Sequence, residues 1–227
     1  MRQDKSVAIK LRKAGNSYNQ ISKKLDIPKS TLSYWLSDLK ISTEAKSKIS
    51  ARSNATSTAA LIKRNKMQTV LAKERSADIR KAAKKESYEL MSSPLFLTGI
   101  SLYWAEGYKK GAEGSKWKSV DFANSDPEMI EVIMKFFRKF LVQDDSKIKV
   151  QIMVHKNIDI DKAVRFWSKL TKLAKGQFIK SSIAISKASK NKRNPNSLTY
   201  GTVHIRINDV KLFFRIIGWI DGLKEKI

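Results

Sequence analysis

Residues 11–39 carry apolar side chains at helical spacing, interrupted twice by residues that end one helix and begin another. At the first interruption, Gly15 can adopt the left-handed conformation that closes a helix, and Ser17 can cap the helix that follows. The second lies at residues 26–28, where a proline can open the next helix. The pattern predicts three short helices joined by tight turns. The third helix places three apolar side chains inward: Leu32, Trp35 and Leu36.

The opposite face of the third helix is polar and basic. Five residues are expected to point outward there: Lys29, Ser30, Thr31, Ser33 and Tyr34. Two short helices joined by a tight turn suit insertion into a DNA major groove. The segment resembles the helix-turn-helix of resolvase and invertase DNA-binding domains and of small transposase-like regulators. Asp26 stands where such turns often carry Gly, and Pro28 stands where Ser or Thr often caps the recognition helix. The resemblance implies that the five outward residues contact base edges or flanking phosphates.

The charge of the chain indicates its partner. Lys and Arg number 46 against 21 Asp and Glu, a net charge of +25, and neutralising phosphates releases condensed counterions. An acidic membrane is the competing partner, but no apolar run approaches the roughly 20 residues that span a bilayer, and the first residues lack the apolar core of a signal peptide. The absence of Cys is compatible with a reducing compartment. We expect double-stranded DNA as the partner, a cytoplasmic, nucleoid-associated location, and neither a membrane nor a small-molecule substrate.

Three parts are expected along the chain: a helix-turn-helix domain at 1–40, a basic helical connector at 41–93 and an α+β domain at 94–227. Residues 41–92 contain no Gly or Pro and are rich in helix formers, which predicts one or two helices. Their apolar residues form only a thin stripe: Leu61, Ile62, Val70, Leu71 and Ile79. We therefore expect an exposed connector. Two interpretations remain open, a solvated linker, or a helix that lies along the phosphate backbone or pairs with its mate in a dimer.

Helix and strand patterns alternate in the last part. Helices are expected at residues 95–106, 128–140, 160–170 and 210–223, and strands near 118–123, 147–155, 177–186 and 200–207. Typical capping residues precede the last three helices: Ser125 or Asp126 before the first, Asp159 before the second, and Asn208 with Asp209 before the third. An antiparallel sheet with helices packed on one face is the economical architecture.

Residues 99–107 read GISLYWAEG, which resembles the LAGLIDADG motif of homing endonucleases and related DNA-binding proteins. That motif is an apolar helix with small residues spaced for close helix packing, which ends in an acidic residue and Gly. Ser101 and Ala105 match the small positions, and Glu106 with Gly107 matches the end. The resemblance covers roughly residues 95–222 and implies the αββαββα order, to which the helix at 160–170 is an addition. One motif per chain implies a homodimer.

The whole order of parts also resembles a class of uncharacterised bacterial and phage-associated DNA-binding proteins. In the LAGLIDADG family, the terminal carboxylates of two paired helices hold a divalent metal at the scissile phosphates. Glu106 is thus the one candidate catalytic residue and ligand for Mg²⁺, which prefers carboxylate oxygen. A carboxylate at a helix C-terminus opposes the helix dipole, so we expect compensation by Lys109 or Lys110. Members of that family that were recruited as regulators lose the cleavage activity. Our main prediction therefore includes no catalytic residue, metal or cofactor. GWIDGL at residues 218–223 repeats the motif without a following strand, and we interpret it as coincidence.

Basic side chains in two loops are further candidates for contact with nucleic acid: Lys109, Lys110, Lys116 and Lys118 in the first loop, and Lys190, Lys192 and Arg193 in the second. Trp117, beside Lys116 and Lys118, is an aromatic candidate for contact with nucleic acid rather than for the core. His155 and His204 are expected as DNA-facing or half-buried polar groups on strands. The sequence therefore predicts a sequence-specific DNA-binding regulator. A metal-dependent homing-type endonuclease is the alternative, and an RNA-binding or structural chromatin-type protein is a third possibility.

Overall fold

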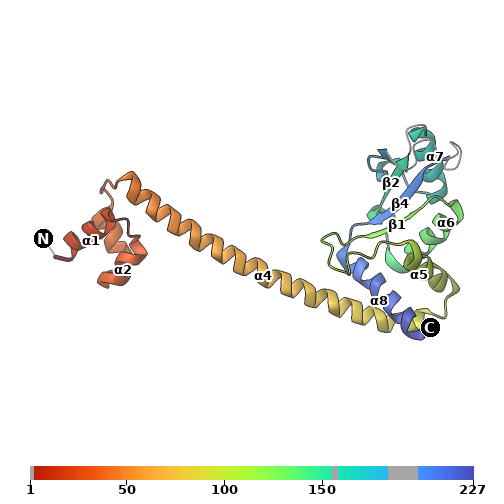
Figure 1. Cartoon of the computed structure of the whole chain (residues 1–227), viewed down its shortest axis with the longest axis horizontal. Helices are drawn as coiled ribbons and strands as arrows, with labels where there is room; N and C mark the ends of the chain where they lie inside the picture. Colours follow the sequence, from red (N-terminus) through yellow and green to blue (C-terminus); the bar gives the residue numbers. More distant parts are fainter. Residues whose placement is uncertain (1–2, 155–157, 184–198) are drawn as a thin grey trace. The chain divides into compact units, whose positions relative to one another are not determined.

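The computed structural model describes residues 3–154, 158–183 and 199–227 (Figure 1). The chain forms two compact units, Met1–Ala72 and Lys73–Ile227. Four candidate residues, His155, Lys190, Lys192 and Arg193, lie outside the described residues. Among the helices that are described, none is both long enough and apolar enough to cross a membrane.

The N-terminal unit contains the three predicted short helices, α1 (Gln3–Lys13), α2 (Tyr18–Leu25) and α3 (Lys29–Leu36). Ser17 and Gln20 form a capping box at the start of α2, in which each side chain accepts a hydrogen bond from the backbone N–H of the other residue. Four fully buried or nearly buried residues form the core of the three helices: Ala8, Ile21, Leu32 and Leu36. The three-helix prediction is confirmed.

Both departures from the helix-turn-helix pattern fit the backbone locally. Asp26 adopts the left-handed conformation with φ of 52°, which Asp tolerates better than most residues. It can therefore occupy the turn position at which Gly is common. Pro28 occupies the position before α3 and makes no side-chain capping bond. Trp35, which was expected to point inward, is half-buried and packs at the edge of the core.

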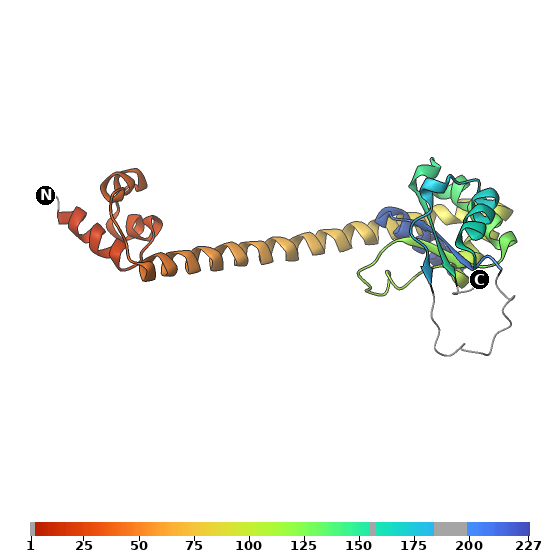
Figure 2. The ribbon, with the colours of Figure 1, turned by 90° about the horizontal axis from the view of Figure 1, so that it is seen from above.

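The connector is one uninterrupted helix, α4 (Thr43–Leu90), drawn from orange to yellow in Figure 2. Every residue from 50 to 70 is exposed, as the connector prediction requires. The prediction is wrong for the end of the helix, because Ala83 and Ser87 are buried and Ala83 belongs to the C-terminal core. The sparse apolar spacing did not predict this burial, because the contact is made by small residues that add nothing to a hydrophobic stripe.

The partner of this buried end is α8 (Val210–Lys226). A Cβ atom at Gly218 would lie 2.3 Å from the backbone oxygen of Arg80, and one at Gly222 would lie 2.0 Å from Oγ of Ser87. Two glycines one turn apart thus let the two helices approach at backbone distance. The interpretation of residues 218–223 as coincidence missed this role, which depends on packing rather than on a following strand.

The C-terminal unit adds α5 (Pro94–Glu106), α6 (Pro127–Phe136) with a π-turn at Phe137–Leu141, and α7 (Ile160–Thr171). The expected caps are present, since the carboxylates of Asp126, Asp159 and Asp209 each accept hydrogen bonds from the first turn of a helix. The strands are β1 (Val120–Asn124), β2 (Ile148–Val154), β3 (Ser182–Ile183) and β4 (Thr202–Ile207). Short 3-10 turns lie at Asp145–Lys147 and Lys175–Gln177.

The sheet has the order β1-β4-β2-β3. Strand β4 is antiparallel to both β1 and β2, as predicted, but β3 runs parallel to β2, which corrects the fully antiparallel expectation. The reason is the helix α7 between them, because a crossover through a helix returns the chain in the same direction.

The expected αββαββα order also differs from the described chain, which runs α5-β1-α6-β2-α7-β3-β4-α8. The resemblance implies two strands between α5 and α6. In the described residues, β1 is the one strand there, and a single isolated bridge between Gly107 and Phe122 takes the place of the other. The intervening segment instead closes on itself through backbone bonds, among them Ala112 to Lys109 and Ser115 to Lys110.

The two faces of the sheet differ in polarity because side chains alternate along each strand. One face carries Ile148, Val150 and Ile152 of β2 and faces the core, to which α5, α6, α7 and α8 contribute. The other face carries the intervening residues, which are polar or sulfur-containing in β2 and β4: Lys149, Gln151, Met153, Thr202, His204 and Arg206. Because apolar residues alternate with polar ones along β2 and β4, one face of the sheet is apolar and the other is polar. We call the second the polar sheet face.

Candidate nucleic-acid interface

The outward face of α3 is the first candidate surface. Lys29, Ser30 and Ser33 are exposed, and Tyr34 is 83% exposed, whereas Thr31 is half-buried. On the opposite side, Leu32 and Leu36 are 0% and 2% exposed and attach α3 to the core. The helix thus presents hydroxyl, phenol and ammonium groups to solvent from an element that is firmly packed on its other side.

The four candidate lysines of the first loop, residues 108–119, differ in their hydrogen bonds and exposure. Nζ of Lys109 donates to the backbone oxygens of Trp104 and Gly107 at 2.7 and 2.8 Å, and Nζ of Lys118 donates to that of Ser115 at 3.1 Å. Lys110 and Lys116 are exposed. Two of the ammonium groups are therefore held against the protein, and the other two project into solvent.

Lys109 supplies the compensation expected at the end of α5. Its ammonium group binds carbonyl oxygens at the negative end of the helix dipole. Partial burial lowers the pKa of Lys109, while the nearby carboxylate of Glu106 acts in the opposite direction. The lysine thus offsets both the unpaired carbonyls and the acidic residue that ends the helix.

Glu106 itself is exposed at the C-terminus of α5. Within the part of the chain that the structure describes, no three His, Asp or Glu side chains converge as a metal site would require. A metal held by Glu106 would need further oxygen ligands from water, phosphate or a second copy of the chain.

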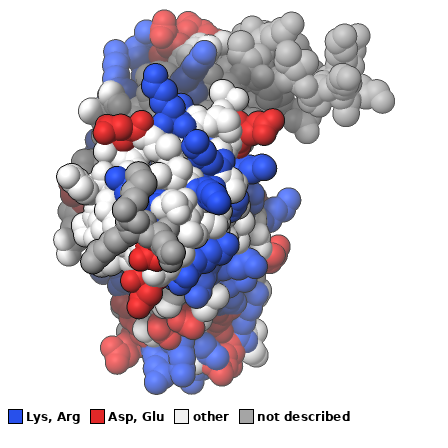
Figure 3. Space-filling model, turned by 90° about the vertical axis from the view of Figure 1, so that its left-hand side faces the viewer, with Lys and Arg blue, Asp and Glu red and all other residues white. Residues whose placement is uncertain are grey.

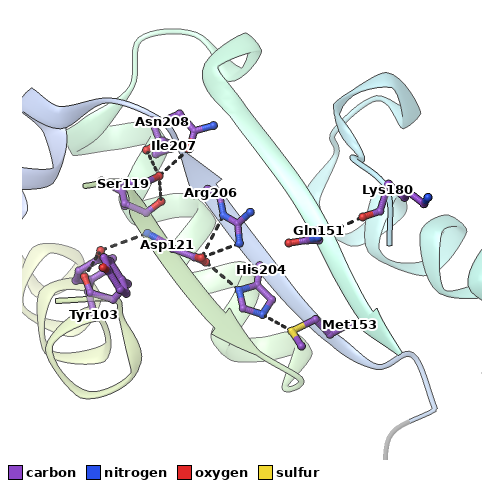
Figure 4. A network of polar contacts seen from close by, with 12 residues as sticks. Tyr103, Ser119, Asp121, Gln151, Met153, Lys180, His204, Arg206, Ile207 and Asn208 are labelled. Atoms are coloured by element: carbon purple, nitrogen blue, oxygen red, sulfur yellow. Dashed lines mark hydrogen bonds and ion pairs between the residues drawn. The ribbon is translucent and has the colours of Figure 1, made fainter. Parts of the chain in front are cut away.

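The polar sheet face contains a connected set of side chains, shown in Figure 4. Asp121 of β1 accepts hydrogen bonds from Nε and Nη2 of Arg206 at 3.1 and 2.9 Å, and its other oxygen lies 3.1 Å from Nδ1 of His204. Nε2 of His204 lies 3.0 Å from Sδ of Met153. The Asp121 side chain is 7% exposed, and its two oxygens orient His204 and Arg206, whose side chains are 18% and 19% exposed.

Trp117 connects the first loop to this sheet face. The guanidinium of Arg206 lies 5.2 Å from the centroid of the Trp117 ring, and the Tyr108 ring packs against the Trp117 ring with centroids 4.4 Å apart. Hydroxyl Oη of Tyr108 donates to the backbone oxygen of Trp117 at 3.2 Å. Trp117 is 41% exposed, which agrees with its assignment as a surface aromatic rather than a core residue.

Sequence reasoning placed His204 on a strand but missed its partners. Asp121 and Arg206 lie opposite each other in the β1–β4 register, and His204 is two residues away on the same face. The strict alternation of Thr202–Ile207 could have identified Arg206 as an outward residue. The pairing with Asp121, 85 positions away in the chain, follows only from the strand order.

Basic side chains occur at both candidate surfaces, with Lys29 on α3 and Lys110, Lys116 and Arg206 at the sheet face and its loop. On the face drawn in Figure 3, Lys and Arg side chains are visible over much of the surface with Asp and Glu among them. No protein-family model, curated protein or solved structure matches the chain.

Proposed function

We propose that the protein is a sequence-specific double-stranded DNA-binding regulator of transcription, in which α3 enters the major groove. The observation that carries the proposal is the outward face of α3, where Tyr34 is 83% exposed while Leu32 is fully buried on the opposite side. Side chains on a rigidly packed helix can discriminate base pairs because their positions are set before binding. In this proposal, residues 1–40 act as a resolvase-like helix-turn-helix, and the protein is located at the nucleoid in the cytoplasm.

The C-terminal unit contributes contacts to the DNA backbone in this proposal. Lys110 and Lys116 project from the first loop, and Arg206 lies on the polar sheet face beside Trp117. Contacts of this kind position a protein on a duplex without reading its sequence. The unit thus acts as the LAGLIDADG-like part of the regulator and adds affinity to the selectivity of α3.

The test is selection of bound sequences from random duplex DNA with the full chain. We expect a defined motif. Tyr34→Ala or Ser33→Ala should change the preferred bases, and the free-energy difference between the preferred base pair and the others should change by about 1–3 kcal/mol per base pair. Lys110→Gln is the control and should weaken all duplexes alike. A selection that yields no motif would contradict the proposal and favour a structural chromatin-type protein.

The active form in this proposal is a homodimer formed through α5. Leu97 and Trp104 are 37% and 36% exposed on this helix, and the small residues Ser101 and Ala105 are exposed on the same side. Small residues allow helices to approach closely, and a twofold pair of chains matches a DNA site with twofold symmetry.

An endonuclease is the second candidate, and the position of Glu106 favours it. Glu106 is exposed at the end of the helix that this dimer would pair, so two copies would bring two carboxylates together. Such a pair would fit Mg²⁺, which acts on phosphate oxygens as a Lewis acid. Incubation with Mg²⁺ and a plasmid that contains the selected site tests this candidate. Cleavage that is lost in Glu106→Gln would support it, and an intact plasmid would exclude it.

A further inference from the structure

A long part of α4 carries positive charge with no acidic residue to balance it. No Asp or Glu occurs between Glu44 and Glu74. The basic residues in this interval are Lys46, Lys48, Arg52, Lys63, Arg64, Lys66 and Lys73. Helices that are polar on all sides are usually stabilised by ion pairs between residues four apart, and this interval can form none within itself. None of its basic residues therefore has a carboxylate partner within the interval.

The basic residues are not spread evenly around the helix. Since an α-helix turns by about 100° per residue, Lys48, Arg52, Lys63 and Lys66 fall within about 60° of one another. We call these four residues the α4 stripe. Lys46 and Arg64 lie about 160° from Lys48 by the same count. The stripe extends over about 27 Å, which is long enough to face several phosphates of a duplex.

The exposed apolar residues of α4 do not form a seam. Counted from Lys48, Leu61, Ile62, Met67 and Val70 point in directions about 220°, 320°, 100° and 40° around the axis. A paired helix or a membrane surface requires apolar residues along one side. The basic stripe follows one side of α4, and its complement is a linear array of negative charges.

An open groove of about 560 Å³ lies beside Arg52, between α2 and α4 in the N-terminal unit. Nη1 of Arg52 donates to Oε1 of Gln20 at 2.7 Å, and the same oxygen accepts from the backbone N–H of Ser17 at 2.9 Å. The capping box of α2 thus positions the guanidinium. The lining also includes hydroxyl and amide side chains (Ser17, Asn19, Ser53, Thr56 and Ser57) and two apolar side chains (Ile49 and Ala55), and it contains no carboxylate.

We propose that the α4 stripe and the groove beside Arg52 bind the phosphate backbone of duplex DNA without reading its sequence. Arg together with hydroxyl and amide groups is the set of side chains that commonly contacts phosphate oxygens. The inference rests on the proposed function and adds a second contact surface to the N-terminal unit, separate from α3. The exposed helix α4 is then a binding element rather than a solvated linker.

The experiment measures binding of the full chain to two fluorescent duplexes of unrelated sequence at salt concentrations from about 50 to 200 mM. Three variants with the same loss of charge are compared: Arg52→Gln, Lys63→Gln and Arg64→Gln. The two stripe variants should weaken both duplexes by the same factor, and each should flatten the salt dependence by about one unit. Arg64→Gln is the matched control from the opposite side of α4 and should retain the wild-type salt dependence. Circular dichroism verifies that helix content is unchanged.

Equal effects of Lys63→Gln and Arg64→Gln would overturn the inference, because they would show that only net charge matters. Loss of affinity in Tyr34→Ala but in neither stripe variant would also overturn it and would leave the proposed function intact. A wild-type chain that binds neither these duplexes nor any selected sequence would overturn both.

Discussion

Glu86 shows how single residues attach α4 to the C-terminal unit. Its carboxylate accepts hydrogen bonds from Nε of Arg215 at 3.0 Å and from Nε1 of Trp219 at 2.9 Å. The Arg215 bond is the main reason that the pKa of Glu86 is lowered from 4.5, and the Trp219 bond adds to it against the effect of burial. Arg215 also donates to the backbone oxygen of Phe140 at 3.1 Å, so three elements meet at one guanidinium.

A lowered pKa makes folding stability depend on pH in a defined direction. The unfolded chain takes up a proton at Glu86 near 4.5, whereas the folded chain takes it up only at a lower pH. The contribution to stability is therefore complete above pH 4.5 and is lost as the pH falls through the folded-state pKa. Urea unfolding at pH 7 and below pH 4.5 should show a smaller acid-induced loss in Glu86→Gln than in the wild type. Glu89→Gln, on the exposed side of α4, should behave like the wild type, and equal losses in both variants would contradict the argument.

At the scale of elements, the packing of α4 on α8 depends on the absence of side chains. Gly218 lies against the backbone of Arg80, and Gly222 lies against Ser87. Arg80 and Asp221 form an ion pair beside this contact, in which Nη2 of Arg80 donates to Oδ1 of Asp221 at 2.8 Å. Close approach and side-chain pairing together join the end of the long helix to the α+β fold.

Gly222→Ala tests this packing. The new Cβ would lie 2.0 Å from Oγ of Ser87 and 2.8 Å from the backbone oxygen of Lys84. Alanine is the better helix former, yet the overlap should lower the free energy of unfolding by about 1–3 kcal/mol. Gly176→Ala is the control, because no atom lies within 4 Å of its added Cβ, and its effect should stay within about 0.5 kcal/mol. Urea unfolding measures both, and a Gly222→Ala protein as stable as the wild type would refute the contact.

For the whole molecule, the proposed dimer predicts a mass of twice 25.8 kDa in sedimentation equilibrium. Leu97→Glu places a charge on the exposed face of α5 and should shift the protein to a monomer, because an unpaired carboxylate is costly in an apolar contact. Val210→Glu changes another exposed apolar residue, which is 49% exposed on α8, and should leave the mass unchanged. A monomeric wild-type chain would disprove the dimer.

Local chemistry accounts for the parts of the fold that could be predicted. The helices before and after Gly15, the caps Ser17 and Asp126, and the alternation of β2 all follow from interactions between residues close in the chain. Such interactions depend on spacing alone, so they could be read before any fold was known. The outward position of Tyr34 on α3 follows in the same way.

Only the tertiary structure decided which distant residues meet. The burial of Ala83, the role of Gly222, the parallel pairing of β3 and the contact of Asp121 with Arg206 all join segments far apart in the chain. Strand order and helix approach depend on how the whole core excludes water, and no local pattern records that balance. The amino-acid sequence determined the elements and their polar faces, and the fold determined which of those faces lie together.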